Sequence, residues 1–303
     1  MSGSDVSQLP VVIEVAVNGA TSPDRNPNVP RTSEEITDVT LRCIEAGASI
    51  IHTHISDIGV PPRRAADLYL EHYRPILEAR PDAILYPTIV FGVAVEDRVA
   101  HLPMLAEECG LRMGICDPGS LNLSGSDEDG IPAPVEFVYT NSPHDTQHMF
   151  AICDQYRLGP GISIFEPGFL RYTLAYRAAG RLPRGANVRL YLGGESSYRG
   201  DGHVDLLFGL PPRPSSIDIY REMMAGTDLV WSVAVLSGDV FANGVARHAL
   251  ECGGHLRVGL EDFAGSRQPN NEELVQQAVE LVKEVGRPLA TPAEAAKILD
   301  LPR

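Results

Sequence analysis

The sequence lacks any apolar run long enough to cross a membrane. Its longest hydrophobic stretches have the length of a β-strand, well short of the ~20 residues that a spanning helix needs. The first eight residues, MSGSDVSQ, contain neither the basic segment nor the apolar segment of a secretory signal. We therefore expect a protein that is neither embedded in a membrane nor secreted.

Basic residues are few relative to acidic ones, and a disulfide pattern is missing. The net charge of −15 argues against nucleic acid or an anionic membrane as a partner, because both select for lysine and arginine. The five cysteines are scattered, odd in number and form no C-x-x-C pair. This pattern is typical of reduced thiols, and so we expect a cytoplasmic protein.

The chain alternates strand-like and helix-like segments from end to end, without internal repeats, low-complexity stretches or a linker. This alternation predicts a single-domain (β/α)8 TIM barrel over residues 1–303. A doubly wound open sheet is the alternative, but the first strand-to-helix turn carries no G-x-G-x-x-G fingerprint. The expected barrel strands are residues 11–17, 48–54, 83–90, 111–116, 161–165, 188–192, 229–235 and 256–260.

Three smaller features accompany the predicted barrel. Residues 135–140 form an extra short strand, and Thr291 with Pro292 opens a short C-terminal helix. A long loop rich in Gly, Ser and Pro follows the sixth strand at residues 193–214. The register of that strand is open, because residues 204–210 are a second candidate.

The segment His52-Thr53-His54 closes an apolar strand and is the strongest functional signal. Alternate residues of a strand point to the same side, so the two imidazoles can bind one metal ion together. Glu261 and Asp262 follow the last predicted strand. The C-terminal ends of barrel strands open onto one face, where we expect these groups to meet.

Two histidines and a carboxylate form a ligand set that zinc enzymes use while keeping one position open for substrate. His52, His54 and Glu261 are the candidate ligands. Asp262 is next to Glu261 and would face the opposite way in a regular strand. It reaches the same site only if it lies where the strand gives way to its loop.

Five phrases along the chain resemble the β-keto acid cleavage enzyme family, and together they span nearly its whole length. The H-x-H and R-x-G-x-E-D phrases stand in the family's order, which makes the match specific. The phrases are Asn18-Gly19-Ala20, Ile51-His52-Thr53-His54, Gly119-Ser120-Leu121-Asn122, the segment from Gly253 to Asp262, and the segment from Gly286 to Pro292.

The resemblance implies a zinc-containing barrel, usually a homotetramer, that turns a β-keto acid and acetyl-CoA into acetoacetate and a new acyl-CoA. One Zn2+ per chain would be held by His52, His54 and Glu261. Arg257 and Asp262 resemble the dyad that activates the substrate, and Thr88 falls where a family serine assists that dyad. The partners implied are therefore a small β-keto acid and acetyl-CoA as co-substrate.

The resemblance also indicates which residues border the substrate, and three of them depart from the family. Many members carry Glu at the position of Thr21, Arg at that of Ser56 and an acidic residue at that of Ser163. These departures argue against a charged amino-substrate. The expected substrate neighbours are Asn18, Thr21, Ser56, Ser120, Asn122, Ser163 and Glu166.

Several alternatives stay open at this point. A metal-dependent aldolase or hydrolase on the same barrel would work without CoA, and a binding protein would hold metal and keto acid without turnover. The loop 193–214 either caps the pocket, contacts CoA or is a solvated surface loop, and its His203 is a further candidate ligand. The residues determine neither the particular β-keto acid, nor the CoA-binding groups, nor the identity of the divalent metal.

Overall fold

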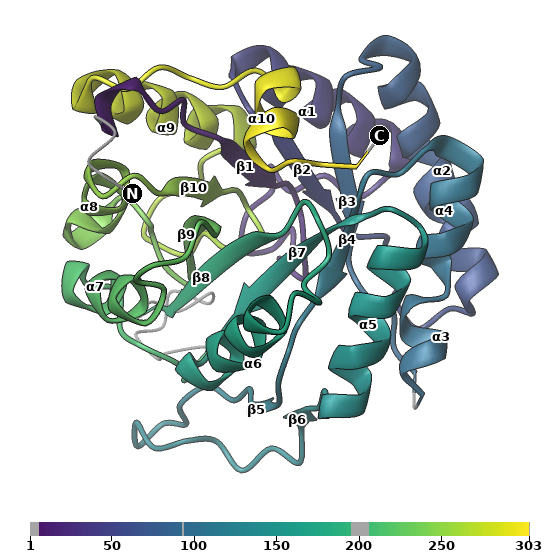
Figure 1. The fold of residues 1–303 in the computed structure, drawn as a ribbon, viewed down its shortest axis with the longest axis horizontal. Coiled ribbons are helices and arrows are strands. Elements are labelled where there is room, and N and C mark those ends of the chain that lie inside the picture. The colour runs from purple at the N-terminus through teal and green to yellow at the C-terminus, as the bar shows by residue number, and fades with distance from the viewer. Residues whose placement is uncertain (1–5, 93, 195–205, 303) are drawn as a thin grey trace.

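A ring of parallel strands surrounded by helices forms the molecule (Figure 1). The computed structural model describes residues 6–92, 94–194 and 206–302. Eight strands form one sheet in the order β3-β2-β1-β10-β9-β8-β7-β4, and every pairing in it is parallel. The two end strands, β3 and β4, lie against one another, so the barrel is nearly closed. The predicted (β/α)8 class is confirmed.

The barrel strands are shorter than their predicted segments but occupy the same places. They are β1 (Ile13–Ala16), β2 (Ile50–Thr53), β3 (Ile84–Pro87), β4 (Met113–Cys116), β7 (Gly159–Ile164), β8 (Asn187–Gly193), β9 (Val230–Leu236) and β10 (His255–Val258). The sixth barrel strand is therefore β8, and residues 206–210 of the second candidate form no strand. The extra strand is confirmed in part: β6 (Val138–Tyr139) pairs antiparallel with β5 (Leu121–Asn122).

The helices follow the strands around the ring. They are α1 (Ser33–Ala46), α2 (Pro62–Ala79), α3 (Val95–Val99), α4 (His101–Cys109), α5 (Pro143–Gln155), α6 (Pro167–Ala178), α7 (Pro214–Met223), α8 (Val245–Glu251), α9 (Asn271–Val285) and α10 (Pro292–Ile298), with 3-10 turns at Val6–Gln8 and Ala242–Gly244. The predicted (β/α)8 alternation places one helix between the third and fourth barrel strands, whereas the structure has α3 and α4 there. Pro103 lacks the N–H that would bond the carbonyl of Val99, which favours a break there.

Two apolar cores hold the fold together and leave one end of the barrel for chemistry. The larger core lies between the strands and the surrounding helices. The smaller core fills the barrel where the strands begin, and it is covered by Ala295 of α10 and by Leu299 just after that helix. The opposite end, where the strands finish, is open to the loops. Among the described residues, no helix combines the length and apolarity needed to span a membrane.

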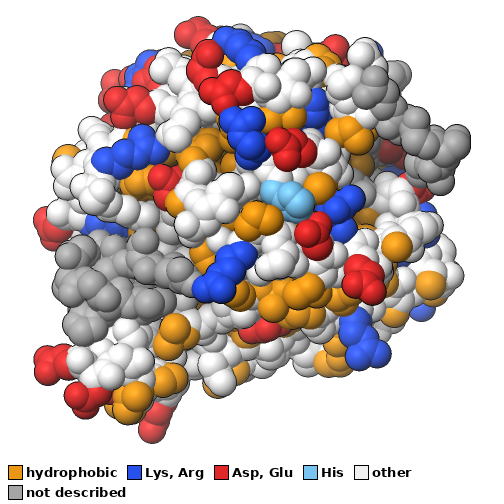
Figure 2. Space-filling model, turned by 90° about the vertical axis from the view of Figure 1, so that its left-hand side faces the viewer, with side chains coloured by type: hydrophobic (Ala, Val, Ile, Leu, Met, Phe, Trp, Pro, Cys, Tyr) orange, Lys and Arg blue, Asp and Glu red, His pale blue; other side chains and the backbone are white. Residues whose placement is uncertain are grey.

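The acidic excess is not gathered into one field on the face that Figure 2 displays. Acidic and basic side chains are interspersed there with hydrophobic ones. Ion pairs on the helices likewise set acidic beside basic side chains: Arg247 of α8 pairs with Glu284 of α9, and Arg221 pairs with Asp218 within α7. Where this face is described, it shows no basic patch of the kind that binds nucleic acid.

Gly259 directs the chain from β10 toward the predicted site. Its φ of +129° is a conformation that side chains rarely adopt, and a Cβ there would overlap the carbonyl oxygen of Ala16. Two residues later the backbone N–H of Glu261 donates to that same oxygen at 3.2 Å. The turn thus fixes Glu261 against β1 by backbone contacts alone.

We expect Gly259→Ala to lower the free energy of unfolding by about 3 kcal/mol or more, because strain and overlap add. Gly286→Ala is the control, since Gly286 has a φ of +77° but open space around its Cβ position. It should lose only about 1–2 kcal/mol. Urea denaturation followed by circular dichroism measures both, and equal losses would contradict the role given to the Ala16 contact.

Candidate active site

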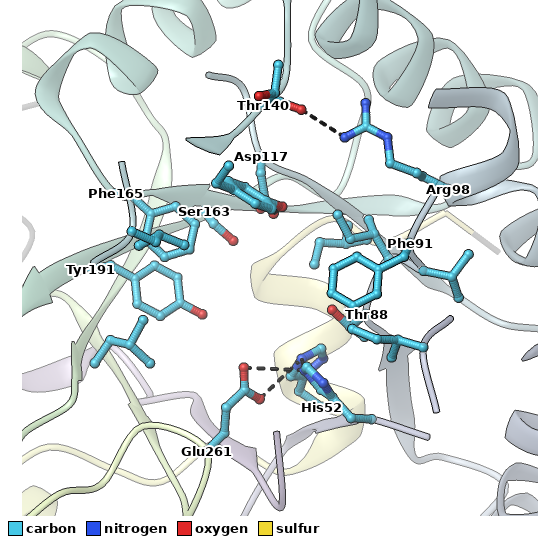
Figure 3. Close-up of a pocket in the computed structure, with 18 of the residues that line it drawn as sticks. His52, Thr88, Phe91, Arg98, Asp117, Thr140, Ser163, Phe165, Tyr191 and Glu261 are labelled. Atoms are coloured by element: carbon cyan, nitrogen blue, oxygen red, sulfur yellow. Dashed lines mark hydrogen bonds and ion pairs between the residues drawn. The ribbon is translucent and has the colours of Figure 1, made fainter. Parts of the chain in front are cut away.

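Three side chains that could bind one metal ion converge at the open end of the barrel. They are His52, His54 and Glu261, which we call the metal-ligating cluster. His52 lies in β2 and His54 just beyond it, and their Nε2 atoms are 3.1 Å apart. The carboxylate of Glu261 lies 3.3 Å from Nε2 of His52 and 3.4 Å from Nε2 of His54. Figure 3 shows Glu261 directed at the imidazoles from the opposite side of the site. The structure thus brings these three residues together, and they can hold one ion.

The tautomer of His52 tests whether these residues suit a divalent metal. Its Nδ1 lies 3.2 Å from the carbonyl oxygen of Tyr86, which only accepts hydrogen bonds. Nδ1 therefore carries the hydrogen, and the lone pair of Nε2 faces Glu261. Burial lowers the pKa of His52 well below its usual value, so the ring is neutral. A neutral imidazole held by a carbonyl is the form that binds zinc.

Glu261 supplies the negative charge of this cluster. Burial alone would raise its pKa, but Arg257 and the two imidazoles outweigh burial and lower that pKa well below its usual range. A guanidinium N–H group of Arg257 lies 3.1 Å from the Glu261 carboxylate. The donor set is thus two imidazole nitrogens and one ionised carboxylate, which fits zinc and several other divalent ions.

Arg257 and Asp262 form a bidentate pair beside the metal-ligating cluster. Nε and NH2 of Arg257 donate to the two carboxylate oxygens of Asp262 at 2.8 and 3.1 Å. Because β10 ends at Val258, Asp262 lies beyond the strand, as the sequence interpretation required. Arg257 borders a cavity of about 500 Å³ that we call the main cavity. Asp262 is not part of the lining of this cavity and lies beside a separate hollow of about 10 Å³. Burial raises the pKa of Asp262 to about 6.

A layer of buried charges below the site was missed by the sequence interpretation. Glu14 of β1 is 1% exposed and accepts hydrogen bonds from the Tyr86 hydroxyl and from Arg257 NH1, the latter at 2.9 Å. Arg189 of β8 is fully buried and lies 3.6 Å from the same carboxylate. The signal was available, since Glu14 and Arg189 each interrupt an otherwise apolar strand segment.

We expect Glu14→Gln to lower the free energy of unfolding by about 3–5 kcal/mol, because two buried guanidinium groups would lose their shared negative partner. Denaturant titration measures this loss. Glu284→Gln is the control, since Glu284 pairs with Arg247 at the surface and such pairs contribute at most about 1 kcal/mol. A loss below 1 kcal/mol for Glu14→Gln would show that the guanidinium groups do not need this carboxylate.

The main cavity opens beside the metal-ligating cluster. His52, His54, Glu261 and Arg257 line one end of it. Thr88, which is 8% exposed, lines it as well. In Figure 3, Thr88 and Phe91 lie on one side of the cavity, and Tyr191 and Phe165 lie on the other.

Of the seven predicted substrate neighbours, some line a cavity at the site and others do not. Ser163 lines the main cavity, and Thr21 lines a second cavity of about 630 Å³ that also borders His54 and Glu261. Asn18 lies one layer back, where its side chain bonds the backbone N–H and carbonyl of His54 at 2.8 and 3.0 Å. It therefore positions a candidate ligand.

The other four of these residues lie outside the lining of both cavities. Ser56 and Asn122 are exposed. Ser120 bonds the backbone of Asn141, and Glu166 accepts a hydrogen bond from the N–H of Gly209 at 2.8 Å. His203 lies outside the described residues, as does the segment 195–205 of the long loop.

Comparison with known proteins places this site in context. A family model described as beta-keto acid cleavage enzyme matches residues 10–301. A 3-keto-5-aminohexanoate cleavage enzyme from Fusobacterium nucleatum subsp. nucleatum is 28% identical over 297 residues, which cover 96% of this chain and 98% of that enzyme. A 3-oxoadipate:acetyl-CoA acetyltransferase from Cupriavidus necator is 27% identical over 299 residues, covering 97% and 95% of the two chains.

A solved structure shares the fold at lower identity. The binary complex of ObcA with oxaloacetate matches with a TM-score of 0.67 and 19% identity, covering 91% of this chain and 68% of that chain. At 19% identity, this similarity shows that the two chains share the barrel fold.

Proposed function

Because the chain belongs to the β-keto acid cleavage enzyme family, we propose that it uses one zinc ion per chain to turn a β-keto acid and acetyl-CoA into acetoacetate and a new acyl-CoA. Cleavage of β-keto acids with transfer to or from acetyl-CoA is the activity of the family and of this enzyme. The observation that carries the finer proposal is the meeting of His52, His54 and Glu261 beside Arg257 at the end of a cavity.

His52, His54 and Glu261 would hold the zinc ion. When bound, zinc supplies Lewis acidity toward the oxygens of the keto acid and makes its α-proton easier to remove. Asn18 and the Tyr86 carbonyl keep the two histidines oriented through the hydrogen bonds described above. Such bonds matter because the orientation of metal-binding histidines is set by the partners of their other atoms.

The Arg257–Asp262 dyad takes the α-proton in this proposal. The proton passes from the α-carbon to the Asp262 carboxylate, while Arg257 keeps its positive charge. Burial opposes the charge of Arg257, but Asp262 and other nearby groups outweigh burial and raise the pKa of Arg257 well above its usual value. The carbanion then bonds to the thioester carbon of acetyl-CoA, and CoA leaves as the thiolate. The CoA thiolate next attacks the original keto carbon, the bond to the α-carbon breaks, and the α-carbon takes the proton back from Asp262, so that acetoacetate is released with a new acyl-CoA.

Two cavities meet at the candidate site, as a reaction of two substrates requires. His54, Leu236 and Glu261 line both the cavity of about 500 Å³ and the one of about 630 Å³. A keto acid in the first cavity and the acetyl thioester in the second would approach the same group of side chains. This arrangement supports the two-substrate reaction over a hydrolase or aldolase that needs no CoA.

The experiment is a screen of zinc-loaded protein with β-keto acids, with and without acetyl-CoA. We expect acetoacetate and a new acyl-CoA only when both substrates are present. Cleavage of a keto acid at the same rate without acetyl-CoA would favour the CoA-independent aldolase or hydrolase instead. Binding of zinc and keto acid without any product would favour a protein without catalytic function.

A further inference from the structure

The main cavity is polar at the metal-ligating end and apolar elsewhere. Beyond the candidate ligands, aliphatic and aromatic side chains of four loops form most of its wall. These are Ile58 after β2, Val90 and Phe91 after β3, Leu123, Phe137 and Val138 around the β5–β6 sheet, and Phe165 after β7. Figure 3 shows Phe165 and Phe91 facing each other across this space.

Part of this wall is exposed to solvent when no substrate is bound. Phe91 is 65% exposed, Val138 is 54% exposed and Phe137 is 45% exposed. Large apolar side chains that cluster around a cavity mark a surface that gains free energy when an apolar group covers it. A substrate tail lying along this wall would remove these side chains from water.

The charged side chains that line the wall away from the metal-ligating cluster are two acidic and two basic ones, namely Asp117, Asp145, Arg98 and Arg189. Arg98 pairs with Asp145 at 3.1 Å and donates to the carbonyl of Thr140 at 2.9 Å. Asp117 accepts a hydrogen bond from the Tyr139 hydroxyl, and Arg189 donates to the Ser163 hydroxyl at 3.1 Å and lies 3.6 Å from the Glu14 carboxylate. Among the described lining residues, the charges of this part of the wall therefore cancel and leave no net charge for a charged tail.

We infer that this enzyme cleaves β-keto acids whose tail is apolar and uncharged. The inference rests on the proposed function, because it names the substrate class of the same site. A charged tail would lose its hydration against Phe91, Val138 and Phe165, in a cavity whose lining charges cancel, and such burial is costly. An alkyl tail loses nothing on leaving water and gains from each methylene that it buries.

The test compares three six-carbon substrates that differ only in the tail: 3-oxohexanoate, the dicarboxylate 3-oxoadipate and the ammonium-bearing 5-amino-3-oxohexanoate. With zinc-loaded enzyme and acetyl-CoA, we expect kcat/KM for the neutral acid to exceed both others by at least about tenfold. Lengthening the neutral tail from 3-oxopentanoate should raise kcat/KM by about fourfold per methylene until the cavity is filled.

Val138→Lys tests the wall itself. Val138 lines the cavity and contributes nothing to the candidate ligands or the dyad. We expect the ratio of kcat/KM for 3-oxooctanoate to that for 3-oxopentanoate to fall about tenfold. Val135→Lys is the matched control, because Val135 has the same residue type and a similar exposure of 53% but does not line the cavity. It should leave the ratio unchanged.

The outcomes separate this inference from the function on which it rests. No acetoacetate from any acid would overturn the proposed function and this inference with it. Acetoacetate formed with 3-oxoadipate or 5-amino-3-oxohexanoate favoured over 3-oxohexanoate would overturn only the apolar tail. An unchanged ratio in Val138→Lys would likewise contradict the apolar wall, while leaving the chemistry at His52, His54 and Glu261 intact.

Discussion

Replacing Asp262 with asparagine should lower kcat for acetoacetate formation by about 10²- to 10⁴-fold while leaving the zinc content unchanged. The amide has the shape of the carboxylate but cannot take the α-proton. Asp262 contacts Arg257 through both oxygens and lies outside the group of metal-ligating atoms, so the ion should stay bound. Steady-state kinetics and metal analysis of the same preparation measure the two effects.

Asp239→Asn is the control for this substitution. Asp239 borders the same small hollow as Asp262, but it pairs with Arg267 near the surface instead of Arg257. Its replacement should leave kcat within about twofold of the wild type, as expected for a side chain outside the site. If Asp262→Asn kept most of its activity, the base would be another group and the dyad would be assigned wrongly.

Replacing either histidine of the H-x-H segment should remove zinc and activity together. His52→Ala deletes a buried imidazole whose Nε2 lies 3.3 Å from Glu261, and two ligands alone bind zinc weakly. We expect the zinc content to fall from about one ion per chain to under about a tenth after dialysis. Activity with acetyl-CoA and a neutral β-keto acid should fall by at least about 10³-fold, since the Lewis acid is lost.

His54→Ala is the second variant, in case His52→Ala fails to fold. The His54 side chain is 16% exposed, so its removal leaves a smaller buried void. His144→Ala is the control, since the His144 side chain on α5 is 73% exposed and is not among the residues that line the main cavity. Metal analysis with circular dichroism on all three variants completes the comparison. Full zinc content in a folded His52→Ala or His54→Ala protein would remove that residue from the ligand set.

The barrel and its metal-ligating cluster were predictable because local patterns and topology agree. An i, i+2 pair on a strand keeps its geometry in any fold, and a barrel places all strand ends on one face. His52, His54 and Glu261 therefore meet as expected. The place of Asp262 was less certain, because it depends on the left-handed turn at Gly259.

The buried charge layer and the cavity wall were harder to predict. Glu14 and Arg189 neutralise each other from strands that are distant in sequence. Neither strand segment, read alone, shows why it contains a buried charge. The wall comes from loops such as residues 121–139, whose conformation depends on tertiary contacts. The family resemblance placed Ser56 and Asn122 beside the substrate. Both are exposed and outside the lining of the main cavity, to which Phe91 and Phe165 contribute.

The central claim is that carbon from acetyl-CoA becomes part of acetoacetate, and position-specific labelling tests it most directly. Zinc-loaded enzyme would be given acetyl-CoA labelled with ¹³C in both acetyl carbons and unlabelled 3-oxohexanoate, and the products would be read by NMR. The account predicts label only at the keto and methyl carbons of acetoacetate, with unlabelled butyryl-CoA as the second product. Unlabelled cleavage products, or label confined to acetate and acetyl-CoA, would contradict it.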